Sequence, residues 1–154
     1  MLKNLDPILN ADLLHILRSM GHGDELALVD CNFPSASVAA ETVSGTPVLL
    51  DNVDIPAAAN AILSVFPLDS FVEEPVLRME VVGSPDEVVE CHSDMQTVMD
   101  ATSDRVWKMG HIERFAFYER AKKAFAVVCA GAERRPYGCF ILVKGVIGPD
   151  GSVV

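Results

Sequence analysis

Short apolar runs without a single charged residue are the feature that most constrains the fold of this chain. Four such runs occupy residues 26–29, 47–50, 125–129 and 139–143. Their length suits a β-strand, and the lack of polar alternation is typical of strands buried on both faces of a sheet. Because such runs alternate along the chain with segments of helical periodicity, we predict an α/β fold of three layers, α/β/α, around a mostly parallel sheet.

Apolar residues in helical register identify the helices. The first begins at Asn10, whose side chain can cap free N–H groups, and ends near Gly21. Ser84, Pro85 and Glu87 form a capping-box pattern, which predicts another helix start. The predicted helices cover residues 10–20, 54–66, 84–101 and 113–123.

Two further segments complete the prediction. Residues 76–82 alternate, with Arg78 and Glu80 on one side and apolar residues on the other, which predicts a half-exposed strand. Residues 102–112 have neither periodicity, and we predict a loop there. No repeat, linker or low-complexity segment divides the chain, so residues 1–154 are interpreted as a single domain.

The chain carries a strong excess of negative charge. It has 12 Lys and Arg against 22 Asp and Glu, a formal net charge of −10. No basic cluster interrupts this pattern, so neither nucleic acid nor an anionic membrane surface is an expected partner. No apolar stretch is long enough to span a bilayer. The mean hydropathy of +0.29 is high for a small domain and indicates apolar surface buried against further copies.

The cysteines and the first residues bear on the compartment. Four cysteines, Cys31, Cys91, Cys129 and Cys139, lie far apart with no Cys-x-x-Cys pair. Reduced thiols are therefore predicted rather than disulfides or a zinc site. The residues after Met1 contain no apolar signal-peptide core, and we expect a cytoplasmic protein.

His22 and Asp30 are the first candidates for chemistry. His22 stands between two glycines in Met20-Gly-His-Gly-Asp-Glu, where the imidazole can be presented to a ligand and can exchange a proton near neutral pH. Asp30 follows a buried strand, at the edge where ligands bind in open α/β sheets. The alternative is that His22 is an ordinary loop residue and Asp30 a turn former.

Three further candidates carry guanidinium or phenol groups. Arg114 and Tyr118 lie four residues apart on one predicted helix face, where both could hold the same hydroxylated ligand. Tyr137 enters a strand and could donate or accept a proton. The alternatives are a surface ion pair for Arg114, a core position for Tyr118 and an edge position for Tyr137.

Other patterns fail as sites. His15 lies inside the first predicted helix, and His92 has no second ligand at a helical spacing. The Gly-His-Gly-Asp sequence lacks the lysine and the further glycines of a phosphate-binding loop. No nucleophile elbow or dinucleotide fingerprint occurs, so we expect neither a metal nor a cofactor.

Taken together, these segments resemble the L-fucose mutarotase family, the relatives of D-ribose pyranase. The resemblance covers nearly the whole chain, and RFAFYER favours the fucose branch. The matching stretches are MGHGDELALVDCNFP (20–34), LDSF (68–71), RFAFYERAKKAFAVV (114–128) and YGCFILVKGV (137–146). It implies a cofactor-free α/β/α sugar enzyme in a ring-shaped homo-oligomer, often a decamer, with sites near subunit contacts.

The resemblance also implies roles for single residues. His22 matches the proton donor of the family, and Asp30 and Arg114 match its sugar-binding residues. Tyr137 and Gly138 match the start of a Tyr-Gly-Asn ligand segment, in which this chain has Cys139 in place of the Asn. That replacement removes an amide contact to the sugar and bears on specificity more than on the type of reaction.

The implied reaction interconverts the α and β anomers of L-fucose or a similar aldose, with pyranose–furanose exchange as a further option. It needs one group to take a proton and another to give one, for which a histidine, a carboxylate and a phenol suffice. We expect His22 to be the main acid and base, Asp30 and Arg114 to hold hydroxyls, and Tyr137 to be an orienting donor or a second acid or base. Three rival functions are a non-catalytic monosaccharide-binding protein, accessory to sugar uptake or regulation, a purely structural oligomer, and a different aldose isomerase. The last would normally need a metal or a second carboxylate base, which the sequence does not indicate.

One spatial difficulty follows from the predicted strand. His22 and Asp30 flank it, and the extended residues between them would span roughly 26 Å. Either the loop 20–25 folds back along the sheet edge, or the two side chains meet across a subunit boundary.

Overall fold

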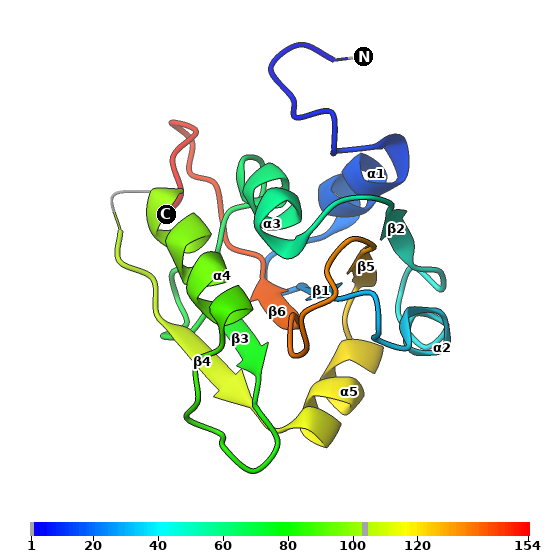
Figure 1. Cartoon of the computed structure of the whole chain (residues 1–154). Helices are drawn as coiled ribbons and strands as arrows, with labels where there is room; N and C mark the ends of the chain where they lie inside the picture. The colour runs from blue at the N-terminus through cyan, green and yellow to red at the C-terminus, as the bar shows by residue number, and fades with distance from the viewer. Residues whose placement is uncertain (1, 103–104) are drawn as a thin grey trace.

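The computed structural model describes residues 2–102 and 105–154, which form one six-stranded sheet (Figure 1). The strand order is β2-β5-β1-β6-β3-β4, and only β6 among these strands runs against its neighbours. The sheet is therefore mixed but mostly parallel, as predicted. The strands are β1 (Glu25–Val29), β2 (Val48–Leu50), β3 (Val76–Met79), β4 (Met109–Ile112), β5 (Ala126–Ala130) and β6 (Phe140–Val143).

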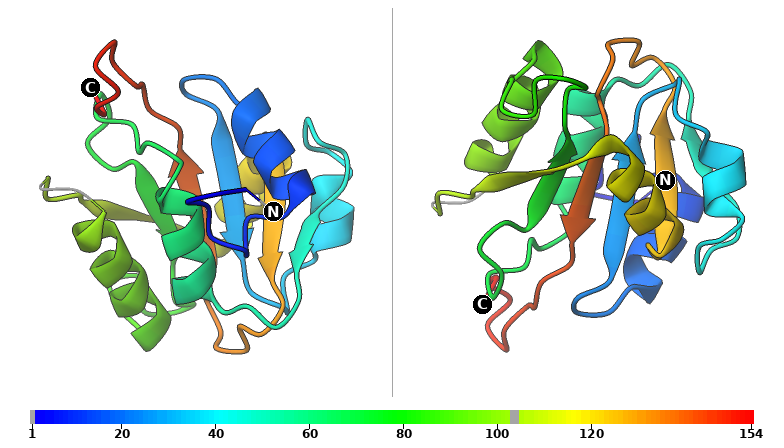
Figure 2. Two further views of the ribbon diagram at one scale, coloured as in Figure 1. Left: turned by 90° about the horizontal axis from the view of Figure 1, so that it is seen from above. Right: turned by 90° about the horizontal axis from the view of Figure 1, so that it is seen from below.

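Helices cover both faces of the sheet, which confirms the three layers (Figure 2). One face carries α1 (Ala11–Ser19), α3 (Ile55–Leu63) and α4 (Glu90–Ala101), and the other carries α2 (Ser35–Ala39) and α5 (Arg114–Lys122). Each face has its own apolar core, because successive strand residues point to opposite faces. Within the described part of the chain, no helix is long and apolar enough to cross a lipid bilayer.

The start of α1 confirms the predicted cap. The side-chain oxygen of Asn10 accepts a hydrogen bond from the N–H of Leu13 at 2.9 Å, and the helix ends with Met20 as its C-cap. Leu13, Ile16 and Leu17 are buried on the sheet side. Asp54 caps α3 in the same way, through the N–H of Ala57 at 3.0 Å.

Two strand predictions were wrong about burial. β2 is an edge strand, and its Leu49 is 58% exposed although the whole run is apolar. β3 ends at Met79, earlier than predicted, and is buried throughout because it lies between β6 and β4. Its Arg78 is therefore buried rather than solvated, with Nη2 donating to the carbonyl oxygen of Pro85 at 3.1 Å.

Two boundaries between β3 and α5 were also wrong. The helix predicted to start at Ser84 starts at Glu90, because residues 84–87 form a turn whose Pro85 carbonyl is used by Arg78. The predicted loop 102–112 contains β4, which pairs in parallel with β3. Pairing with a neighbouring strand, not periodicity, makes this segment extended. Residues 103 and 104 of that prediction lie outside the described residues.

The cap of α1 gives a test of this arrangement. Replacing Asn10 by Ala leaves the N–H of Leu13 without its acceptor and should lower the free energy of unfolding by about 1 kcal/mol. Asn10→Asp keeps an oxygen in the same place and should cost little. Urea unfolding of both variants measures the difference, and equal losses would contradict the observed cap.

Candidate functional site

A pocket of about 220 Å³ lies at the carboxyl ends of β1 and β3, beside the start of α5. Five of the sequence candidates meet there, namely Asp30, Arg114, Tyr118, Tyr137 and Cys139. The pocket is smaller than the ~300–1,000 Å³ common for sites of drug-sized ligands. Its remaining lining residues are Asn32, Phe33, Met79 and Pro136.

Asp30 and Cys139 form the floor of this pocket. Asp30 is 5% exposed, and burial raises the pKa of its carboxyl group above the usual value. Two groups stabilise the carboxylate: the N–H of Asn32 donates to Oδ1 at 2.9 Å, and the Cys139 thiol lies 3.4 Å from Oδ2. Burial also raises the pKa of Cys139 well above its usual range, so the thiol stays protonated and serves as a donor.

Arg114 and Tyr118 supply one wall from α5, as their spacing predicted. The Nε of Arg114 is buried and has no hydrogen-bond acceptor within residues 2–102 and 105–154. Its guanidinium carbon lies 4.6 Å from the ring centre of Phe115. A buried donor without an acceptor is costly, so this nitrogen favours a ligand that brings an oxygen.

Tyr137 enters the pocket from the segment that joins β5 to β6. Its backbone has φ of 66°, a left-handed conformation that is unfavourable for a residue with a Cβ. Its hydroxyl oxygen accepts a hydrogen bond from the N–H of Val82 at 3.3 Å. Because the oxygen is the acceptor in this contact, the hydroxyl proton remains available to a ligand.

An ion pair between the buried Glu133 and the partly exposed Arg135 holds this segment in shape. Glu133 is 2% exposed and accepts from the Arg135 guanidinium, with Nε at 2.9 Å and Nη2 at 2.8 Å. Arg135 also donates to Asp94 of α4 at 2.7 Å, which ties the segment to that helix. Gly138 lies against Asp30 and Glu133: a Cβ there would come within 3.0 Å of Glu133 Cγ. A larger residue at this position would therefore push against the Glu133 side chain.

His22 lies elsewhere, in a second cluster with Asp69 and Phe71. Its Nε2 is 3.2 Å from Oδ2 of the buried Asp69, and the other carboxylate oxygen accepts from the N–H of Phe71 at 3.0 Å. A carboxylate can only accept, so Nε2 carries a proton and donates it to Asp69. Buried Asp69 thus fixes the tautomer and orientation of a half-exposed imidazole.

The two clusters lie at opposite ends of β1. The N–H of Gly23 donates to Lys144, beyond one end of the β1–β6 ladder, whereas Asp30 follows its other end. At strand rise, the distance along β1 is on the order of 20 Å. Figure 2 shows the same separation: the segment before β6 (orange) and the segment after it (red) lie at opposite ends of the molecule. The loop 20–25 does not fold back along the sheet.

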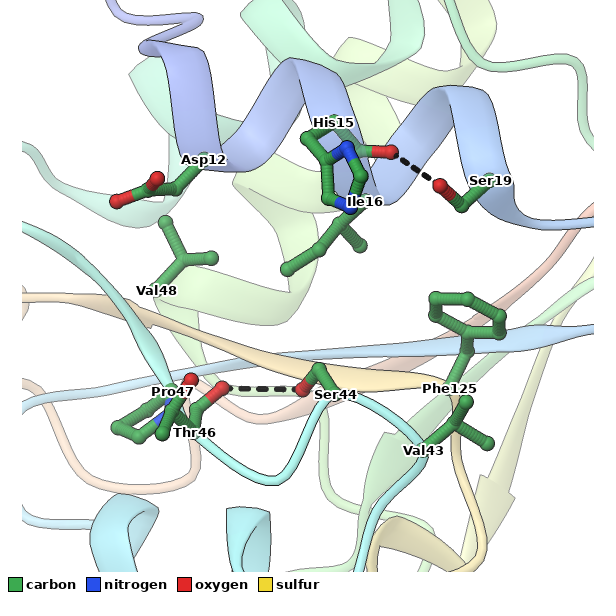
Figure 3. A pocket seen from close by; sticks show the side chains of 10 residues that line it. All are labelled: Asp12, His15, Ile16, Ser19, Val43, Ser44, Thr46, Pro47, Val48 and Phe125. Atoms are coloured by element: carbon green, nitrogen blue, oxygen red, sulfur yellow. Dashed lines mark hydrogen bonds between the residues drawn. The ribbon is translucent and has the colours of Figure 1, made fainter.

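Another cavity, of about 370 Å³, lies between α1 and the segment 43–48 (Figure 3). Asp12, His15 and Ser19 of α1 face Ser44 and Thr46 across it. None of the candidate residues lines this cavity, although it is larger than the pocket at Asp30. Most of its lining comes from the exposed side of α1 and from the segment that leads into the edge strand β2.

Several residues of both clusters were missed from sequence. Asp69 belongs to the quoted LDSF stretch, but its contact with His22 joins residues 47 positions apart, which no local pattern predicts. Glu133 and Arg135 form a short polar turn that resembles any surface loop. The four cysteines are free, and three of them are buried, with Cys31 exposed. The described part of the chain contains no group of three side chains placed to hold a metal ion.

Fold and site together define a single-domain α/β protein with a small pocket of polar and apolar side chains at the carboxyl edge of its sheet. Residues 3–147 match the model of the RbsD / FucU transport protein family, and the chain belongs to this family.

Named relatives agree with this assignment. The fucose mutarotase of Danio rerio is 43% identical, with 97% of this chain and 96% of the relative covered. The L-fucose mutarotase of Histophilus somni (strain 2336) is 41% identical, covering 95% and 97%. The crystal structure of the Streptococcus pneumoniae fucose mutarotase in complex with L-fucose is 35% identical, with a TM-score of 0.84 over 96% of this chain and 100% of that one.

The buried carboxylates give a pH-dependent prediction. The pKa of Asp30 is raised on folding, so its ionisation destabilises the folded state as pH rises above about 3.9. Asp30→Asn should therefore be more stable than the parent at pH 7, with the gain vanishing as pH falls through that value. The opposite case is Glu133, whose pKa is lowered by Arg135.

Glu133→Gln should lose about 1–2 kcal/mol at neutral pH, since the Arg135 partner is partly exposed, and the loss should shrink in acid. Urea unfolding between pH 3 and 7 tests both signs. A stability gain from Asp30→Asn that did not change with pH would contradict the raised pKa of Asp30.

Proposed function

We propose that this protein is a fucose mutarotase, which interconverts the α and β anomers of L-fucose or a similar aldose. The observation that carries the proposal is the meeting of a carboxylate, two phenols and the Arg114 guanidinium in one small pocket, with the buried Nε of Arg114 lacking an acceptor among the described residues. These groups match the many hydroxyls of a monosaccharide. The curated relatives at about 40% identity over nearly the full length support the same activity.

The reaction opens and recloses the sugar ring with acid and base catalysis. A base takes the proton from the anomeric hydroxyl while an acid protonates the ring oxygen, and the bond between that oxygen and C1 breaks to give an aldehyde. Rotation about C1–C2 exposes the other face, and the roles reverse when the ring closes. Reactant and product are isomers, so no oxidant or reductant takes part.

The residues divide between holding the sugar and moving its protons. Asp30 and Arg114 bind sugar hydroxyls, with Tyr118 as a further contact on the same helix face. Tyr137 donates its hydroxyl proton, since its oxygen already accepts from Val82. Gly138 and Cys139 form the floor around Asp30, where the thiol replaces a side-chain amide. His22, oriented by Asp69, is the main acid and base.

His22 can act on a sugar held by Asp30 only if it comes from another copy of the chain. Two exposed aromatic residues support such an assembly, because Phe71 beside His22 is 66% exposed and Phe115 beside Arg114 is 62% exposed. Covering them would bury apolar surface at the point where the two clusters meet. We therefore place the complete site between neighbouring copies of a ring-shaped cytoplasmic homo-oligomer, decameric by family resemblance.

Anomeric exchange can be measured directly. Saturation transfer between the anomeric proton signals of L-fucose, with D-ribose in parallel, should be faster with the protein than without it. His22→Ala should lower the catalysed rate by about 10²–10⁴-fold, the usual contribution of an acid/base group. His15→Ala removes an exposed histidine of α1 that does not line the pocket at Asp30, and it should change nothing.

Two outcomes would contradict the proposal. Binding of L-fucose without acceleration would leave a monosaccharide-binding protein accessory to uptake or regulation. An unchanged exchange rate in His22→Ala would contradict the role of His22 as acid and base, although the protein would still be a mutarotase.

A further inference from the structure

A buried histidine outside the proposed chemistry contacts the backbone of Tyr137. His92 lies in the first turn of α4 and has no exposed surface. Its Nδ1 is 3.3 Å from the N–H of Val89, and its Nε2 is 3.0 Å from the carbonyl oxygen of Tyr137. An N–H only donates and a carbonyl only accepts, so Nδ1 is the acceptor and Nε2 carries the proton.

The surroundings keep this imidazole neutral. Burial lowers the pKa of His92 to about 4, and the positive charge of the nearby Arg78 acts in the same direction. The ring of Phe140 meets the imidazole edge to face, with 5.9 Å between ring centres. At neutral pH the ring is thus a fixed hydrogen-bond bridge, with one acceptor and one donor in use.

The bridge ends at the most strained point of the pocket. Tyr137 has a left-handed backbone, which persists only where its surroundings hold it. His92 fixes its carbonyl, and the N–H of Val82 fixes its hydroxyl. The neighbouring Pro136 carbonyl is 3.6 Å from the thiol of Cys91, also on α4. The first turn of α4 therefore holds the backbone from which the phenol reaches into the pocket.

We propose that His92 is a positioning residue for Tyr137: its Nε2–H holds the tyrosine backbone in the left-handed conformation that aims the phenol at the sugar. This inference rests on the proposed function for the role of the phenol. His92 itself touches neither substrate nor proton in transfer. Its effect on catalysis passes through Tyr137.

Two amide side chains that differ by one methylene provide a matched test. His92→Gln places an N–H donor near the position of Nε2, whereas the shorter His92→Asn cannot reach the Tyr137 carbonyl. His92→Asn should lower kcat for anomeric exchange by about 10- to 100-fold with a smaller change in KM, because a small displacement of the Tyr137 phenol from the reacting oxygen slows proton transfer. His92→Gln should recover most of the rate.

A second comparison separates positioning from general damage. In a Tyr137→Phe background the phenol is absent, so His92→Asn should cause almost no further loss of kcat. An equal fold loss in both backgrounds would overturn the proposal, as would an unchanged kcat in His92→Asn itself.

Two NMR readouts do not depend on turnover. The chain has two tyrosines, so ¹³C labelling at Cζ gives two signals, and His92→Asn should shift that of Tyr137 while Tyr118 serves as the internal control. In the parent protein, ¹⁵N spectra of the four histidines should give His92 as the neutral Nε2–H form at pH 7.

If these spectra gave His92 as the Nδ1–H tautomer or as the charged imidazolium, the proposal would be overturned. This test uses the parent protein alone, so it does not depend on whether a variant folds. If no aldose exchanges faster with the parent protein, the proposed function fails, and the NMR readouts still decide whether His92 holds Tyr137.

Discussion

The path of β1 through the middle of the sheet is the constraint on which the rest of the structure depends. It places Gly23 and Asp30 beyond opposite ends of one buried strand, because hydrogen bonding to β5 and β6 leaves no freedom to bend. Asp30 and His22 of one chain are therefore too far apart to touch the same small ligand. Asp69 lies behind His22 at one end and Cys139 behind Asp30 at the other, and under the proposed function each end supplies half of a site.

The fold was largely predictable where local residue patterns decide which secondary structure forms. Apolar runs of strand length identified β1, β5 and β6, and Asn10 identified the start of α1. Errors arose where tertiary contacts override local patterns. The residues of the capping pattern at Ser84 form a turn instead of a helix start, and the Pro85 carbonyl of that turn accepts a hydrogen bond from the buried Arg78. The segment of β4 is extended because it pairs with β3. Exposure of Leu49 depends on the position of β2 at the sheet edge, which apolarity does not encode.

The pocket was predictable in part, for a physical reason. Asp30, Arg114 and Tyr118 follow strand ends and helix faces, and these regular elements place them together. Tyr137 was found as a candidate, but its left-handed backbone and the imidazole that holds it were not. His92 looks like a lone histidine in sequence, and its meaning comes from a carbonyl 45 positions away. The Asp69 partner of His22 is 47 positions away. Long-range hydrogen bonds of this kind have no periodic signature, so they require the fold.

Co-expression of two impaired variants tests most directly whether copies share a site. In random mixtures of His22→Ala and Arg114→Ala subunits, about a quarter of the sites between neighbours contain both intact side chains, and exchange should return to about that fraction of the parent rate. Mixtures of Arg114→Ala with Tyr137→Phe carry both defects in the same half of the site and should stay impaired. Recovery in the first mixture alone is the predicted result. No recovery in either mixture, with mixed oligomers formed, would contradict a site shared between copies.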